Sequence, residues 1–270
     1  MTRTTQIAQE VTIAVGGTPI LLRCPDEEFW SIIEQRYSGF VSEVGWPACV
    51  FDVEVTQPER SISSVRELLV QNDGDGWRLE RGDFRVAWNA RTGEGRILQT
   101  ATPYAIDTAL RIVHTIVQAT RGGFLLHGAS AIRNGRAFLF SGVSGAGKTT
   151  ISRLAPEEAI LLTDEISYIT RSGDDYRAWG TPFAGELARP GENAAARIER
   201  LYFLAKGPEN TIEPIPAGDA LRLLLRNILF FADDPELVKM VFRSANGFLE
   251  KVPAYRLTFY PDGRVWDLIQ

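Results

Sequence analysis

The stretch FLFSGVSGAGKTTISRL at residues 138–154 places three glycines and one lysine between an apolar run and a helix-like run. Within it, GVSGAGKT at residues 142–149 fits the pattern G-x-x-x-x-G-K-[ST]. A short strand before this pattern and a helix start after it are the setting in which it forms a phosphate-binding loop. The alternative is a glycine-rich turn with a surface lysine. We predict the phosphate-binding loop.

Each residue type in this loop has a physical reason. Glycines let backbone N–H groups converge on phosphate oxygens, and the helix start near Lys148 adds a positive dipole end. Lys148 is predicted to bridge the β and γ phosphates, and the Thr149 hydroxyl is predicted to ligate Mg²⁺. The residues predicted to bind the nucleotide are Gly142, Ser144, Gly145, Ala146, Gly147, Lys148, Thr149 and Thr150.

A predicted hairpin upstream places a histidine beside the loop. Asn134 and Gly135 separate two extended runs, which is a strong signal for a two-residue hairpin turn. In that register Ile132 pairs with Ala137, and His127 comes opposite Gly142. A bulge would shift the pairing by one residue. A histidine merely buried at a strand end is the alternative to a functional one.

An acidic pair follows the loop. The apolar run at residues 159–162 ends in Thr163, Asp164 and Glu165. A carboxylate at the end of a strand after the loop helix can hold Mg²⁺, and another can accept the proton of an attacking hydroxyl. The sixteen positions between Lys148 and Asp164 leave room for a helix of two to three turns and one strand. Two solvated acids at a strand end are the alternative.

The ordered set LLHGASAI, SGVSGAGKT and LLTDEI resembles the HPr kinase/phosphorylase group, related to phosphoenolpyruvate carboxykinases. It looks closest to HPr-kinase-like proteins of bacterial peptide-modification clusters, some of which phosphorylate a serine on a precursor peptide and others free serine. The resemblance covers roughly residues 122–270. It implies roles for His127, the loop and Asp164. HPr kinases carry two aspartates where this chain has Asp164 and Glu165, so their phosphatase activity is not carried over.

The rest of the chain is read from its periodicities and turn residues. We expect an α/β (α+β) protein with a smaller β-rich domain at 1–101, a junction helix at 102–121, and an HPr-kinase-like P-loop domain at 122–270. A helix is expected at about 217–231, and the C-terminal stretch 254–269 is expected to form two extended runs around Asp262 and Gly263. The glycine- and proline-rich stretch 180–193 is either a loop that closes on the phosphates or a plain surface connection. The N-terminal domain either docks a partner or braces the kinase domain.

Composition excludes several function classes. The net charge is −5, so nucleic acid is not favoured as a partner. With two cysteines and two histidines, a zinc cluster is improbable. The low cysteine count is typical of a protein of the reducing cytoplasm. His114 is read as structural. No apolar run is long enough to span a membrane. No N-K-x-D string occurs, which argues against a guanine-specific enzyme.

Together these features predict an ATP- and Mg²⁺-dependent kinase acting on a serine-type hydroxyl of a peptide or protein. Asp164 is expected to be the base, Glu165 to assist the metal or the substrate, and His127 and Lys148 to act on the transferring phosphate. The predicted metal ligands are Thr149, Asp164 and Glu165. Two alternatives remain: a nucleotide-binding regulatory module without transfer, and a kinase of free serine or another small molecule. The resemblance also implies a possible homo-oligomer.

Overall fold

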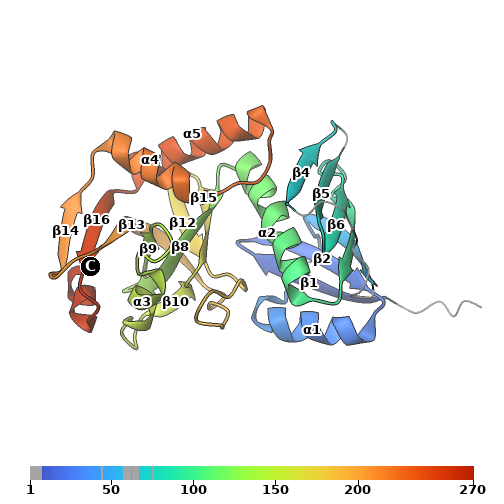
Figure 1. The fold of residues 1–270 in the computed structure, drawn as a ribbon, viewed down its shortest axis with the longest axis horizontal. Helices are drawn as coiled ribbons and strands as arrows, with labels where there is room; N and C mark the ends of the chain where they lie inside the picture. Colours follow the sequence, from blue (N-terminus) through green and yellow to red (C-terminus); the bar gives the residue numbers. More distant parts are fainter. Residues whose placement is uncertain (1–7, 44, 57–61, 63–66, 75) are drawn as a thin grey trace, which may run out of the picture. The chain divides into compact units, whose positions relative to one another are not determined.

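The computed structural model describes residues 8–43, 45–56, 62, 67–74 and 76–270. These form a mixed α/β structure that divides into two compact units. One unit comprises Met1–Val113 and Phe231–Asp234, and the other comprises His114–Phe230 and Pro235–Gln270. The division falls inside one long helix, α2 (Pro103–Thr120) (Figure 1).

The N-terminal unit is built on a seven-stranded mixed sheet in the order β1-β2-β3-β7-β6-β5-β4. Its first two strands form a hairpin that turns at Gly16 and Gly17, and they are followed by the helix α1 (Glu27–Tyr37), which is capped by Asp26. One face of the sheet is buried, because apolar residues alternate along its strands. The strands are β1 (Gln9–Val15), β2 (Thr18–Cys24), β3 (Cys49–Thr56), β4 (Leu69–Asn72), β5 (Trp77–Arg81), β6 (Phe84–Trp88) and β7 (Glu94–Thr100).

The C-terminal unit is built on a nine-stranded sheet. Its path runs β10-β8-β11-β12-β13-β16-β14, with β9 pairing both β8 and β13 and β15 pairing β8. The strands are β8 (Phe124–Arg133), β9 (Arg136–Ser141), β10 (Ile160–Thr163), β11 (Ile166–Ser172), β12 (Asp175–Trp179), β13 (Ala195–Lys206), β14 (Thr211–Pro214), β15 (Ile228–Leu229) and β16 (Ala254–Phe259). The helices are α3 (Lys148–Arg153), α4 (Ala217–Asn227) and α5 (Pro235–Lys251).

Three strands of this unit share one direction. β13 is parallel to β9 on one side and to β16 on the other. The carboxyl ends of all three therefore lie at the same edge of the sheet. The loop predicted to bind phosphate, residues 142–147, leaves from the end of β9 and is called the phosphate loop below. Ligands bind at the carboxyl ends of parallel strands in open α/β sheets.

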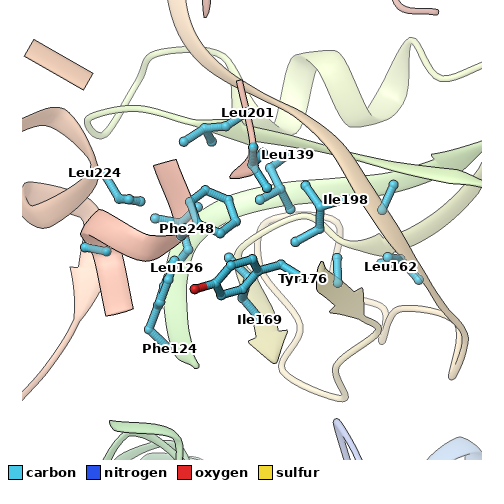
Figure 2. Packing of buried hydrophobic residues seen from close by; sticks show 14 of the residues in the cluster. Phe124, Leu126, Leu139, Leu162, Ile169, Tyr176, Ile198, Leu201, Leu224 and Phe248 are labelled. Atoms are coloured by element: carbon cyan, nitrogen blue, oxygen red, sulfur yellow. The ribbon is translucent and has the colours of Figure 1, made fainter. Parts of the chain in front are cut away.

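The main core of this unit packs α4 and α5 against the sheet. Phe248 of α5 is fully buried, and its ring makes edge-to-face contacts with Phe124 and Tyr176 at centroid distances of 5.3 and 5.1 Å. Figure 2 shows these rings among the buried aliphatic side chains of the strands. This packing supports β8, the strand that carries His127.

Three expectations about the C-terminal unit were wrong in detail. The helix expected at 217–231 ends at Asn227, because Ile228 and Leu229 pair with β8 as the short strand β15. The second extended run expected after Asp262 is instead a 3-10 helix, η2 (Gly263–Leu268), whose start is capped by the Asp262 carboxylate. The helix after the phosphate loop, α3, has six residues, fewer than two full turns.

The histidine that was read as structural is deeply buried. His114 is 1% exposed, and its Nδ1 lies 3.1 Å from the Tyr168 hydroxyl. Burial, assisted by the positive charge of Arg121, lowers the pKa of His114 from 6.5 to about 3. The imidazole is therefore neutral in the folded protein at neutral pH.

This buried imidazole is expected to make the protein less stable in acid. Below pH 6.5 the unfolded chain binds a proton at His114 that the folded chain refuses until about pH 3, so the free energy of unfolding falls across that window. The slope from this group approaches about 1.4 kcal/mol per pH unit. Urea titrations between pH 7 and 4 measure it, with His114→Gln as the comparison. Equal pH dependence in both proteins would contradict the expectation.

Within the described part of the chain, the longest and most apolar helices fall short of what a membrane span requires.

Candidate functional site

The phosphate loop connects β9 to α3, as the sequence pattern predicted. Gly147 immediately precedes α3 and has a φ of +111°, in the region that favours glycine. A Cβ there would lie 2.7 Å from Cζ of Phe259, whose ring comes from the end of β16. The turn into α3 therefore requires glycine for its backbone angle and also for its close packing.

Lys148 is folded back onto its own loop. Its side-chain ammonium donates to the carbonyl oxygens of Gly142 at 3.0 Å and Val143 at 3.3 Å, and the residue is 8% exposed. Burial lowers the pKa of Lys148, and the charges of Glu165 and Glu186 oppose that shift. The lysine is thus held close to two carboxylates and to the loop backbone.

The β8–β9 hairpin has the predicted two-residue turn and the predicted register. Ile132 pairs with Ala137 and Gly128 with Ser141, without a bulge. The next residue, His127, is half-buried, and its carbonyl accepts a hydrogen bond from the Ser141 hydroxyl at 2.9 Å. Burial, and secondarily the charge of Lys148, lowers the pKa of His127. Its imidazole is neutral at neutral pH.

The acidic pair reaches His127 because the two strands that it connects pair with successive parts of β8. Thr163 at the end of β10 pairs with Ser130, and Ile166 at the start of β11 pairs with His127. Asp164 and Glu165 therefore lie alongside β8 between these two pairs, and the Glu165 carbonyl accepts from the Gly128 N–H at 2.9 Å. This pairing sets both acids beside the phosphate loop.

The Asp164 carboxylate also holds a distant loop. One oxygen, Oδ1, accepts from the Gly185 N–H at 3.0 Å, and Oδ2 accepts from the Leu187 N–H at 2.9 Å. A Cβ on Gly185 would lie 2.8 Å from Oδ2, so only glycine allows this approach. Asp164 itself is 5% exposed. The glycine- and proline-rich stretch is thus neither free of the site nor a plain surface connection.

These elements surround a cleft of about 690 Å³. The predicted residues on its wall are His127, Ser144, Gly145, Gly147, Lys148, Thr149, Thr150, Asp164 and Glu165. Two predicted nucleotide-binding residues do not line it: the Ala146 side chain is buried in a hydrophobic cluster, and Gly142 contacts Lys148 through its carbonyl. The wall also includes residues that sequence reasoning did not assign to the site: Ala184, Gly185, Glu186 and Lys206.

The residues missed by sequence reasoning come from two segments that are distant in the chain. Glu186 lies in the loop that Asp164 holds, and Lys206 is the last residue of β13. The first segment belongs to the stretch 180–193, for which the sequence left open a loop that closes on the phosphates and a plain surface connection. Lys206 had no local signal, because its position follows from the parallel pairing of β13 with β9.

Replacing Gly147 by alanine is expected to weaken nucleotide binding by about tenfold to a hundredfold. The new methyl group would displace either the loop or the Phe259 ring, and small displacements of positioning groups have effects of that size. Titration with a fluorescent ATP analogue measures the affinity. Gly173→Ala is the matched control, because Gly173 also has a positive φ but a Cβ there meets nothing within 4 Å. Equal affinities in the two variants would contradict the expectation.

The family model described as SynChlorMet cassette protein ScmC matches residues 99–270. Among solved structures, the Hpr(Ser) kinase/phosphatase from Coxiella burnetii is similar at 9% identity and a TM-score of 0.29, over 54% of this chain and 90% of that chain. No match is found among curated proteins.

Proposed function

This chain belongs to the ScmC family of SynChlorMet cassette proteins, and we propose that it is an ATP-dependent kinase. The acceptor we propose is a serine-type hydroxyl on a peptide or protein. One observation carries the proposal: His127, Lys148 and the acidic pair, which are separated in sequence, face one cleft around the phosphate loop. Phosphoryl transfer needs this combination of positioned cations, backbone donors and a carboxylate.

The residues present fit a nucleotide with magnesium. The positive φ of Gly147 lets the loop turn into α3, and Ser144, Gly145 and Gly147 of the loop line the cleft. Successive backbone N–H groups in such a turn are suited to bind phosphate. Thr149, Asp164 and Glu165 offer the oxygen ligands that Mg²⁺ prefers. Among the described residues no three His, Cys, Asp or Glu side chains are grouped to hold a metal. That suits Mg²⁺, which keeps several waters and binds mainly through one or two carboxylates and phosphate oxygens. Bound magnesium would neutralise charge on the phosphates.

The chain's own residues would then have separate roles in phosphoryl transfer. The Asp164 carboxylate takes the proton of the acceptor hydroxyl as the hydroxyl oxygen bonds to the γ-phosphorus and the bond to the β-phosphate oxygen breaks. Two loop amides fix the orientation of that carboxylate. The neutral His127 orients the transferring group. Lys148 exchanges its loop carbonyl partners for phosphate oxygens.

Labelled ATP tests the proposal directly. The full-length protein with [γ-³²P]ATP and magnesium is incubated with serine-containing peptides, an unrelated protein substrate and free serine. Transfer to peptide serine is the expected result, and transfer to free serine alone would assign the small-molecule alternative. If ATP binds and every acceptor stays unlabelled, the kinase proposal is wrong.

A nucleotide-binding regulatory module is the second candidate, and one contact favours it. The Asp164 carboxylate accepts two backbone hydrogen bonds, which is also how a purely structural carboxylate would hold a loop. In such a module Asp164 would transmit nucleotide binding to the loop without transferring phosphate. The Asp164→Asn variant separates the two candidates.

A further inference from the structure

Lys206 stands at the cleft without an assigned role. It is the last residue of β13, its side chain is exposed, and it lines the same cleft as Lys148. Among the described residues its ammonium has no carboxylate partner and no hydrogen bond. A lysine left without a partner at a binding cleft is available to a ligand.

The position of Lys206 follows from the sheet. Ser141, the last residue of β9, pairs with Phe203 of the parallel strand β13, so Lys206 lies three residues further toward the edge from which the phosphate loop departs. Leu204, two residues earlier and on the same face, packs in the cluster that includes Ala146 of the loop. On its other side Lys206 pairs with Phe259, whose ring lies against Gly147. Two independent neighbours thus set Lys206 beside the loop.

The charge of the cleft shows what this lysine would do. The wall carries three carboxylates, Asp164, Glu165 and Glu186, and His127 is neutral there at neutral pH. The only cations on the described wall are Lys148 and Lys206. A polyphosphate entering this cleft meets a wall with one more negative than positive charge. Each cation that contacts phosphate therefore has a large influence on affinity.

We propose that Lys206 is a second phosphate-binding cation of the site, which contacts the phosphate chain of the nucleotide from the strand side while Lys148 contacts it from the loop. This inference rests on the proposed nucleotide-binding function. It predicts an affinity that rises with the number of phosphates, because Lys206 recognises their charge and makes no use of the nucleoside.

Affinity measurements on Lys206→Met test the assignment. Dissociation constants are measured by calorimetry for ATP, ADP, AMP and inorganic tripolyphosphate, with magnesium present, on the full chain. We expect ATP and tripolyphosphate to bind about tenfold more weakly to Lys206→Met, ADP less so, and AMP within twofold of the wild type. Lys206→Arg is expected to recover most of the loss. Lys239→Met is the matched control, because Lys239 is an exposed lysine on α5.

The outcomes separate this inference from the kinase proposal. Wild-type affinity for ATP in Lys206→Met, or an equal loss for ATP and AMP, overturns the role of Lys206. Phosphate-dependent losses in a protein that transfers no phosphoryl group support Lys206 and overturn only the kinase. If the wild type binds neither nucleotide nor tripolyphosphate, both fall. Because the side chain is exposed, the variant is expected to keep the wild-type thermal midpoint.

Discussion

Replacing Asp164 by asparagine is expected to lower the rate of phosphoryl transfer by about 10²–10⁴-fold. The proposed base loses its ability to take the acceptor proton, and loss of a general base has effects of this size. Asparagine also turns one acceptor oxygen into an NH₂ group, so either the Gly185 or the Leu187 N–H loses its partner. Single-turnover transfer from labelled ATP measures the rate.

Nucleotide affinity distinguishes the reasons for such a loss. In Asp164→Asn, ATP is expected to bind within about threefold of the wild type, because the phosphate loop itself is unchanged. The control is Glu157→Gln, which neutralises an exposed acid outside this cleft. A variant that transfers at the wild-type rate would remove Asp164 from the mechanism. If the wild type itself transfers no phosphoryl group and Asp164→Asn still binds ATP, the regulatory module is favoured.

Replacing Lys148 by methionine is expected to lower the transfer rate by about 10²–10³-fold and to weaken ATP binding as well. The ammonium is the loop's own cation for developing charge, and removing one such donor has effects of this size. Methionine keeps the apolar stem in the buried position. Steady-state kinetics and calorimetric titration of ATP measure the two losses.

The thermal midpoint of Lys148→Met distinguishes a loss of transfer caused by the missing ammonium from a loss caused by unfolding. Burial lowers the pKa of Lys148, which means that the fold disfavours its charged form. Its two hydrogen bonds to loop carbonyls offset that cost. The thermal midpoint of Lys148→Met is therefore expected to stay near that of the wild type. Unchanged transfer by a folded Lys148→Met protein would contradict the proposed mechanism.

Some features of the site followed from short stretches of sequence. The turn at Asn134 and Gly135 fixed the register of the β8–β9 hairpin, since both residues accept the positive φ values of 51° and 73° that a two-residue turn demands. That register placed His127 next to the loop. The pattern at residues 142–149 predicted the strand, the loop and the helix start in order.

Other expectations failed where a local pattern had more than one solution. Ile228 and Leu229 continue the apolar spacing of α4, yet they pair with β8 as a short strand. Val265 and Trp266 could alternate in a strand, but Trp266 is buried and its indole N–H donates to the Ile151 carbonyl at 3.1 Å. Partners more than a hundred residues away decided the outcome.

By itself the sequence determined the strand, loop and helix start around residues 142–149, the adjacent histidine and the acids after the next strand, because turn chemistry and alternation act between residues close in the chain. Only the tertiary structure decided that β10 and β11 pair with successive parts of β8, that Asp164 accepts hydrogen bonds from the amides of Gly185 and Leu187, and that Lys206 faces the cleft. Those contacts join segments 21 to about 60 residues apart. They depend on how the strands assemble. The order of strands in a sheet cannot be predicted from the periodicity of any one segment.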